Sequence, residues 1–221
     1  MATSRFRDNI LWFHWQLGEN ERIIEKSVRS MSEPQHKIYR KNIQATPFGP
    51  VVIFWRPAAH VSRIVRVLLS RPGLSAESAS SGLFPGASLS SCPELDREAD
   101  AVAAFLEGED VTFSLEWVDL DSCSPFQRNV LRAEHKIPRG MLSTYQLIAR
   151  RLGKPGGARA VGSALANNPF PIIVPCHRAV RSDGFPGGYQ GGAAMKRSLL
   201  EKEGIAFDIK GRVIAPRFYF G

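Results

Sequence analysis

"STYQLIARRLGKPGGARAVGSALANN", residues 143–168, holds two short segments with apolar stripes, separated by a turn rich in glycine and proline. Ser143 or Thr144 can cap the first helix, which carries large apolar residues at helical spacing, and Gly153 ends it. A second helix is expected over about residues 157–166, after "KPGG". Two short helices joined by a tight turn predict a helix-turn-helix, the motif that places its second helix in a DNA groove.

The second expected helix offers few side chains that could read base edges. Asn, Gln, Arg and Lys are the usual readers in the major groove, and here Arg159 is the one strong hydrogen-bonding side chain among small residues. One interpretation is a small-residue helix packed into the core. The other is a helix that presses on DNA without sequence preference, with Arg159 probing the base stack, as a protein that extrudes a damaged base requires.

The positive charge is concentrated in the C-terminal part of the chain. Residues 125–221 contain 16 Lys or Arg and 5 Asp or Glu, a net charge of +11, whereas residues 1–124 contain 13 and 16, a net charge of −3. This asymmetry favours a polyanionic partner for the C-terminal part, although a solvated basic surface would give the same count.

Bulk composition indicates a soluble protein. The 221 residues are 43% hydrophobic, and no stretch approaches the ~18 continuous apolar residues of a membrane span. The first twenty residues lack the apolar core of a signal peptide. Cys92, Cys123 and Cys176 are too widely spaced for a disulfide framework or a zinc motif. We therefore expect an intracellular protein of a reducing compartment, with no membrane partner and no metal.

Downstream of the helix pair, "NPFPIIVPCHRAV" places Cys176 and His177 side by side at the end of an expected buried strand. A thiolate is the reactive form of cysteine, and an unperturbed thiol has a pKa of ~8.5, so a nucleophilic Cys176 needs a base. Neighbours on an extended chain point to opposite faces, so His177 is expected to act through a bridging water. A base needs an orienting group, and Glu203 or Glu201 in "LLEKEG" can supply it.

The rest of the chain alternates short strands and helices. Residues 1–45 show weak periodicity and receive no assignment. The remaining expectations, in chain order, are a turn and strand in "TPFGPVVIFWRP" (46–57), a short helix in "SRIVRVLLSR" (62–71), a loop over 72–91, a helix from Pro93 that Gly108 ends, a strand in "VTFSLEWVDL" (111–120) and a helix in "FQRNVLRAEHKIP" (126–138).

Five motifs follow one another along the C-terminal part of the chain: "FQRNVL", "IPRGMLSTYQLIARRLG", "ARAVGSALANNPFPIIVPCHR", "GGYQGG", and a lysine followed by "LLEKEG". In this order and spacing, residues 126–204 resemble the catalytic domain of the O6-alkylguanine-DNA alkyltransferases, also called methylated-DNA–protein-cysteine methyltransferases. The resemblance implies an α/β (α+β) fold with an N-terminal ribonuclease-H-like domain over 46–122. A mostly helical, helix-turn-helix domain for DNA binding and alkyl transfer would follow over 123–221, and 1–45 would be an extension.

The resemblance also implies roles for single residues. Cys176 would accept the alkyl group and keep it, His177 would deprotonate the thiol through water, and Glu203 would orient His177. Asn168 would brace the turn around the active site. Tyr145 would donate a proton toward the guanine ring and crowd the 3′ phosphate, so that the nucleotide rotates out of the helix.

Two further sets of residues follow from the same resemblance. Besides Tyr145, the residues implied to contact DNA are Arg159, which would fill the gap in the base stack, and Ala158, Gly162, Ser163, Leu165 and Arg178. The residues implied to shape the substrate pocket are Pro171, Val174, Tyr189, Gln190, Gly191 and Lys196.

The function expected from the resemblance is direct reversal of DNA damage in a single turnover. The O6-alkyl group of guanine, and the methyl group of O4-methylthymine, would pass from duplex DNA to the protein without a cofactor. We expect a monomer, cytoplasmic in a prokaryote or nuclear in a eukaryote.

Three other functions compete with this one. An alkyltransferase-like lesion-binding protein would lack the cysteine of the motif. A helix-turn-helix regulator that senses through its cysteine would need a second helix richer in base readers. A cysteine hydrolase would normally bring its nucleophile and base from different parts of the chain.

Overall fold

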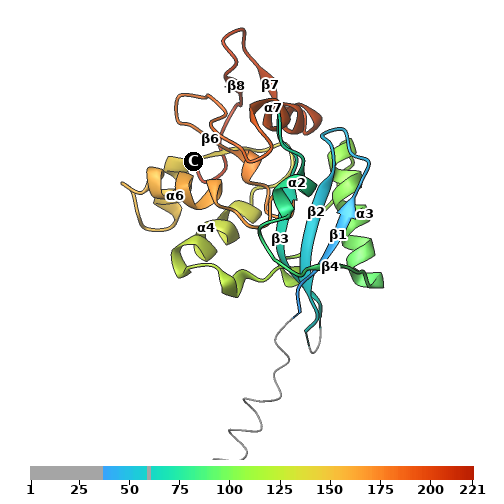
Figure 1. Ribbon diagram of the computed structural model, residues 1–221. Helices are drawn as coiled ribbons and strands as arrows, with labels where there is room; N and C mark the ends of the chain where they lie inside the picture. Colours follow the sequence, from blue (N-terminus) through green and yellow to red (C-terminus); the bar gives the residue numbers. More distant parts are fainter. Residues whose placement is uncertain (1–36, 59–60) are drawn as a thin grey trace, which may run out of the picture. The chain divides into compact units, whose positions relative to one another are not determined.

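A four-stranded sheet forms the first part of the region that the computed structural model describes, residues 37–58 and 61–221 (Figure 1). Its strands are β1 (Tyr39–Ile43), β2 (Val51–Arg56), β3 (Arg63–Leu69) and β4 (Ser88–Leu89), in the order β3-β2-β1-β4. The β1–β2 and β2–β3 pairs are antiparallel, and β1 and β4 are parallel. The expected strand after "TPFG" is thus confirmed as β2.

Both faces of the sheet are covered, which is why β2 is an unbroken apolar run. Val51, Ile53 and Trp55 face the large core, to which α3 (Pro93–Glu107) contributes. Val52 and Phe54 point the other way, into a smaller cluster that includes Ala76 of the short helix α2 (Ala76–Ser80). A strand buried on both faces reads as continuous apolar sequence and not as an alternation.

Helix α3 agrees with its sequence signals. Pro93 occupies the first turn, where its absent N–H is not needed, and the apolar stripe faces the core. Gly108 ends the helix with φ 110°, and its N–H donates to the carbonyls of Ala104 and Phe105. A left-handed residue at this point favours glycine, because any Cβ would be strained there.

Three expectations for the N-terminal part are wrong. "SRIVRVLLSR", expected to be helical, is strand β3, because pairing with β2 along its length outweighs a weak local preference. Residues 111–120, expected to be a strand, contain the 3-10 helix η1 (Leu115–Trp117) and only an isolated bridge from Val118 to Ile64. Residues 72–91, expected to be a loop, contain α2 and β4.

The sheet begins earlier than the sequence indicated. Strand β1 lies at 39–43, inside the segment of 1–45 that received no assignment. The rest of that segment, residues 1–36, lies outside the described residues. Four of the five residues of β1 are polar or aromatic and all five are half-buried, so no strong apolar period marks it. The expected boundary at 122 stays a prediction.

The second part is mostly helical. Its elements are η2 (Leu120–Ser122), α4 (Pro125–His135), β5 (Ser143–Thr144), α5 (Tyr145–Arg151), α6 (Ala158–Ala166), η3 (Cys176–Arg178), β6 (Ala179–Val180), α7 (Ala193–Lys202), β7 (Ala206–Phe207) and β8 (Val213–Ile214). The helices expected over 126–138, 143–152 and 157–166 are confirmed as α4, α5 and α6. Thr144, one of two candidate caps, accepts a hydrogen bond from the amide of Leu147 at 3.1 Å.

One continuous apolar core joins the two parts. It runs from Val67 of β3 through Leu106 of α3 to Val130 of α4 and Ile173. The amide of Val67 also donates to the carbonyl of Pro169 at 2.8 Å. The N-terminal sheet therefore holds the segment that leads to Cys176. None of the helices in the described ranges has the length and apolar character that crossing a bilayer requires.

Candidate active site

A tight turn, and not the expected strand end, delivers Cys176 to the site. Asn168 braces this turn: its Oδ1 accepts from the Phe170 amide at 2.9 Å, and its Nδ2 donates to the Val174 carbonyl at 3.1 Å. Ile172, inside the turn, has φ 76°, which is costly for a β-branched residue and is held here by complete burial. Cys176 then begins the 3-10 helix η3.

Cys176 opens into a cavity of about 300 Å³. The cavity is lined by Arg71, Tyr145, Gly162, Leu165, Ala166, Cys176, Gly188, Tyr189 and Gln190. Six of these residues were expected to contact DNA, substrate or the alkyl group. Gly188 belongs to the "GGYQGG" motif, whose glycines the resemblance implied to shape the loop over the substrate base, whereas Arg71 and Ala166 were not expected there. Arg71 follows β3 in the N-terminal part of the described chain, so motifs confined to the C-terminal part could not have indicated it.

His177 and Glu203 form a buried pair. Nε2 of His177 lies 2.9 Å from Oε1 of Glu203, and both residues are less than one-tenth exposed. Burial by itself opposes ionisation of Glu203, but its bonds to His177 and Arg178 lower its pKa to about 2. An ionised carboxylate only accepts, so Nε2 of His177 carries the proton. Glu201, the other candidate orienting group, is half exposed and pairs with Arg197.

The remaining ring nitrogen of His177 can act as a base. Nδ1 is buried and has no hydrogen-bond partner in the described part of the chain. Burial lowers the pKa of His177, with Glu203 acting in the opposite direction, so the imidazole is neutral near pH 7. A neutral ring protonated on Nε2 leaves a lone pair on Nδ1. This arrangement fits a bridging water between the base and the neighbouring thiol.

Arg178 serves Glu203 and not DNA. Its Nε and Nη2 donate to the Glu203 carboxylate at 2.7 to 3.1 Å, and its Nη1 donates to the carbonyl of Ile137 at 2.6 Å. Only 7% of Arg178 is exposed. The expectation that Arg178 contacts DNA is therefore corrected, because its guanidinium is already used inside the protein.

Burial keeps the Cys176 thiol protonated in the free protein. It raises the pKa of Cys176 to about 11, while a hydrogen bond with the Asn168 side chain and the charge of Lys196 oppose the shift. Very little thiolate is present at neutral pH, so Cys176 is protected against indiscriminate alkylation. The thiol must lose its proton within the reaction itself.

Tyr145, the first residue of α5, remains a hydrogen-bond donor. Burial raises its pKa to about 12, and the charges of Glu134 and Cys176 act in the same direction. The loop over the site is shaped to this hydroxyl. Gly187 has φ 76°, and a Cβ built on it would lie 2.7 Å from Tyr145 Oη. Any larger residue at Gly187 would displace the donor.

The loop that contains Gly187 also contacts the turn that precedes Cys176. Nε2 of Gln190 donates to the Asn168 carbonyl at 2.6 Å, and the Tyr189 ring meets His177 edge-on with centroids 6.2 Å apart. The buried Lys196 ammonium donates to the Ala179 carbonyl at 2.7 Å. Four expected pocket residues support the site from within the protein and do not line the cavity: Pro171, Val174, Gly191 and Lys196.

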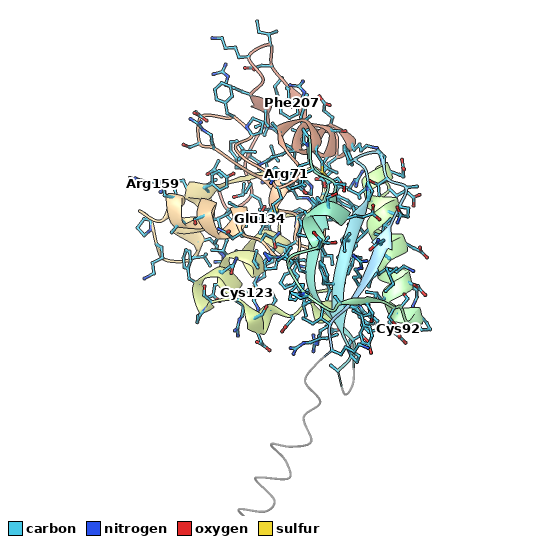
Figure 2. The ribbon with its side chains drawn as sticks, viewed as in Figure 1. Arg71, Cys92, Cys123, Glu134, Arg159 and Phe207 are labelled. Carbon is cyan, nitrogen blue, oxygen red and sulfur yellow. The ribbon has the colours of Figure 1, made fainter. Side chains whose placement is uncertain are left out.

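Helix α6 presents a small-residue surface with one long cation. Arg159 projects outward from it in Figure 2, and its side chain makes no hydrogen bond or ion pair with another described residue. Ser163 is exposed, and Ala158 and Gly162 are half-buried beside it. Leu165 faces the core and the cavity, so its side chain is only 5% exposed.

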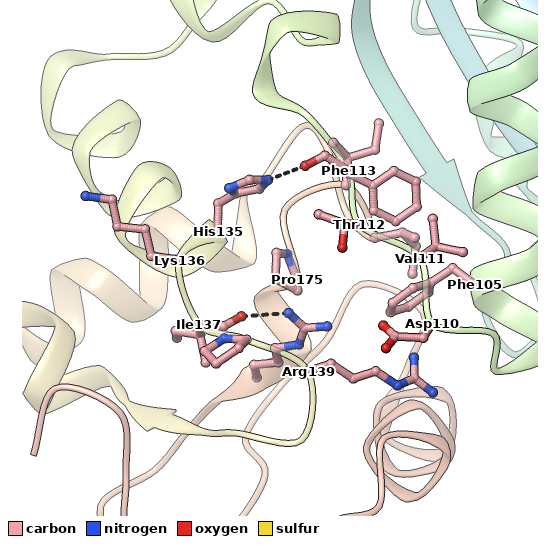
Figure 3. Close-up of a pocket in the computed structure, with 14 residues that line it drawn as sticks. Phe105, Asp110, Val111, Thr112, Phe113, His135, Lys136, Ile137, Arg139 and Pro175 are labelled. Atoms are coloured by element: carbon pink, nitrogen blue, oxygen red, sulfur yellow. Dashed lines mark hydrogen bonds between the residues drawn. The ribbon is translucent and has the colours of Figure 1, made fainter.

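A second and larger cavity has a volume of about 500 Å³ (Figure 3). Arg178, Pro175 and Ile137 line it, and Nε2 of His135 lies 2.9 Å from the Phe113 carbonyl at its edge. Neither Cys176 nor Tyr145 lines this cavity. The smaller cavity at Cys176 is therefore the one suited to chemistry. Within the described ranges, no three potential ligands gather closely enough to hold a metal ion.

Several known proteins similar to the chain are named methylated-DNA–protein-cysteine methyltransferases. Residues 125–205 match the family model described as 6-O-methylguanine DNA methyltransferase, DNA binding domain. A methylated-DNA–protein-cysteine methyltransferase of Methanothermobacter thermautotrophicus is 46% identical over 109 residues, 49% of this chain and 61% of that protein. The Mycobacterium leprae protein of the same name is 44% identical over 115 residues, 50% of this chain and 68% of that protein.

A solved structure extends the similarity beyond the matched segment. The crystal structure of Mycobacterium tuberculosis OGT in complex with DNA has a TM-score of 0.59 and 34% identity, and covers 75% of this chain and 92% of that chain. The chain spans less than two thirds of the Methanothermobacter protein.

Proposed function

Because the chain belongs to the O6-methylguanine-DNA methyltransferase family, we propose that it repairs alkylated DNA by transferring the O6-alkyl group of guanine to Cys176. The observation that carries this proposal is the buried Cys176–His177–Glu203 arrangement at a cavity beside a helix-turn-helix. The M. tuberculosis relative solved in complex with DNA supports DNA as the partner.

The chemistry is a single displacement at an sp³ carbon. Nδ1 of His177 takes the thiol proton through a water, and the Cys176 sulfur forms a bond to the alkyl carbon as the carbon–O6 bond breaks. The electron pair of that bond remains on guanine, and the Tyr145 hydroxyl hydrogen-bonds the ring as negative charge develops there. A thioether has no group here to remove it, so each molecule acts once.

Binding would precede chemistry and would depend on phosphate contacts. The net charge of +11 over residues 125–221 supplies attraction without sequence preference. The small exposed residues of α6 allow the helix to approach the groove closely. Arg159 would then occupy the space left by a nucleotide that has rotated into the cavity at Cys176.

Several finer assignments belong to the same proposal. The sheet with α2 and α3 is a ribonuclease-H-like domain ending near 122, and the second domain begins at 123. O6-alkylguanine in duplex DNA is the main substrate and O4-methylthymine a second one. The protein acts as a monomer where chromosomal DNA lies, in the cytoplasm of a prokaryote or the nucleus of a eukaryote. The sheet order β3-β2-β1-β4, with antiparallel pairs and one parallel pair, supports the first of these assignments.

Intact-mass analysis tests the proposal. The protein is mixed with a duplex containing one O6-methylguanine, and a gain of about 14 Da, one methylene by atomic composition, is expected on the Cys176 peptide. Cys176→Ala should abolish the gain, and Cys123→Ala, which also removes a buried thiol, should retain it. A label on another cysteine, or several turnovers per molecule, would contradict the proposal.

A lesion-binding protein without transfer activity is the second candidate. It would recognise the same flipped base and would need no nucleophile. The thiol at the cavity favours transfer, because a binding protein gains nothing from a cysteine backed by a histidine–glutamate pair. In the mass assay, tight binding without mass gain would support this second candidate.

A further inference from the structure

Arg71 is a cation at the mouth of the Cys176 cavity that the reaction described above does not use. It follows β3 in the N-terminal part of the described chain, whereas the other residues that line this cavity come from the second part. Among the described lining residues, Arg71 alone carries a charge at neutral pH, because burial keeps the Cys176 thiol protonated. In Figure 2 Arg71 lies where the sheet meets the second part.

The Arg71 side chain is not used inside the protein. The residue is exposed, and its guanidinium makes no hydrogen bond or ion pair with another described residue. Two other arginines of the second part differ in this respect: Arg178 is buried against Glu203, and Arg181 pairs with Asp183. The five N–H donors and the positive charge of Arg71 are therefore free to bind whatever occupies the cavity mouth.

A tight turn fixes the backbone that carries Arg71. The amides of Arg71 and Leu74 each donate to the carbonyl of the other, at 3.0 and 2.9 Å. Pro72 and Gly73 occupy the two central positions, and Gly73 has φ 78°, as a type II turn requires. The buried Ser70 anchors the turn, because its hydroxyl donates to one backbone carbonyl at 2.6 Å and accepts from one amide at 2.9 Å. Binding of a ligand by Arg71 therefore orders its side chain and leaves the backbone as it is.

Two contacts hold this turn beside the active site. Upstream of it, the amide of Val67 in β3 donates to the carbonyl of Pro169 at 2.8 Å, in the segment that leads to the reactive thiol. At the turn itself, a Cβ built on Gly192, which has φ 91°, would lie 3.3 Å from Cδ of Pro72. Pro72 therefore packs closely against the loop over the cavity, and the turn is fixed relative to both the thiol and the loop.

A phosphate is the ligand that suits Arg71 in this position. A nucleotide whose base enters the cavity leaves its two flanking phosphates at the mouth, because the sugar–phosphate chain must continue in both directions. A guanidinium binds such an oxyanion through charge-assisted hydrogen bonds. Residues 1–124 have a net charge of −3, so Arg71 supplies attraction for DNA in a part of the chain that as a whole supplies none.

We propose that Arg71 binds a phosphate next to the flipped nucleotide, so that the N-terminal part of the chain completes the DNA-binding surface of the helix-turn-helix. The proposal rests on the proposed function, because it requires that a nucleotide enters the Cys176 cavity. The contact forms once the base has entered, so it stabilises the flipped state relative to nonspecific binding.

Replacement of single phosphates tests the contact. Full-length Cys176→Ala protein, which can bind without transferring, is titrated by fluorescence anisotropy with a duplex containing one O6-methylguanine. The phosphates around the lesion are replaced one at a time by uncharged methylphosphonates. Adding Arg71→Gln should weaken binding to the all-phosphate duplex by about tenfold, the order expected for one hydrogen bond to a charged group, and lower the salt slope by about one. At one methylphosphonate position Arg71→Gln should cause no further loss, because its partner is already absent.

Two further variants separate a phosphate contact from a general effect of charge. Arg97→Gln is the matched control: Arg97 is exposed on α3, does not line the cavity, and should leave the affinity unchanged. Arg71→Lys keeps the positive charge and should retain most of the affinity. The proposal would be overturned if Arg71→Gln did not weaken binding, if Arg97→Gln weakened it equally, or if the loss from Arg71→Gln were the same at every methylphosphonate position. Should the glutamine variant fail to fold, Arg71→Met carries the same expectation.

Transfer assays with Cys176 intact keep the two proposals distinguishable. Arg71→Gln should slow transfer from subsaturating duplex by about tenfold and leave the reaction with free O6-alkylguanine base unchanged, because the free base has no phosphate. An equal loss on the free base would overturn the proposal, since the turn would then merely support the pocket. Coupling between Arg71 and one phosphate, without transfer by the wild-type protein, would refute the proposed function alone. Transfer from DNA without such coupling would refute the role of Arg71 alone.

Discussion

Replacing Glu203 by glutamine tests the electrostatic centre of the site. The substitution keeps the size of the side chain and removes the charge that His177 and Arg178 share. Arg178 would remain buried without a counter-charge, and Nε2 of His177 would face an amide that can either donate or accept. We expect lower stability and slower methyl transfer together, because one carboxylate supports both.

The structure sets the size of the stability loss. The pKa of Glu203 falls from 4.5 to about 2, and at about 1.4 kcal/mol per unit this corresponds to about 3 kcal/mol of stabilisation at neutral pH. As an independent estimate, removing one partner of a buried ion pair typically lowers the free energy of unfolding by about 3–5 kcal/mol. Since the folded-state pKa is depressed, the contribution is complete above about pH 4.5 and is lost as pH falls toward 2.

Urea denaturation of wild-type protein, Glu203→Gln and Glu201→Gln measures the effect. Glu201 is the matched control, because it is two residues away, half exposed and paired only with Arg197 at i,i+4, which is worth about 0.3–0.5 kcal/mol. The difference in free energy of unfolding between the wild-type protein and Glu203→Gln should become smaller as pH falls from 4.5 to 2. The reasoning would be refuted if Glu203→Gln and Glu201→Gln lost equal stability, or if the stability difference between Glu203→Gln and the wild-type protein did not change with pH.

Three further predictions concern DNA handling and the substrate loop. Gly187→Ala should slow methyl transfer strongly by displacing Tyr145 Oη, whereas Gly86→Ala, with a similar positive φ and nothing within 4 Å of its Cβ, should leave the rate unchanged in the same single-turnover assay. Arg159→Ala should slow repair of duplex DNA far more than reaction with free O6-alkylguanine, where nothing must be flipped; full recovery of the rate at saturating duplex would assign Arg159 to a phosphate instead. The logarithm of the binding constant for undamaged duplex, measured by fluorescence anisotropy, should fall linearly with the logarithm of salt concentration. The binding constant should vary little with DNA sequence.

The site was predictable where its members lie close together in sequence. The thiol and the imidazole are adjacent, so the residues themselves indicated them, and Asn168 and Tyr145 fall in the same run of motifs, so the family resemblance implied them. Arg178, also in that run, was misassigned, because its sequence position does not reveal that the guanidinium points inward to Glu203. Arg71 was not singled out at all, since it lies outside that run of motifs, in the N-terminal part of the chain.

By itself the sequence determined the helices α3 to α6 and the chemical pair of thiol and base. Helix N-caps, glycines at helix C-termini and apolar stripes depend on residues three or four positions apart, so they can be recognised from the sequence. Tertiary structure alone decided that 63–69 is a strand and that Glu203 rather than Glu201 meets His177. Strand pairing and burial of charge depend on partners tens of residues away, and their energies arise only when the fold removes those groups from water.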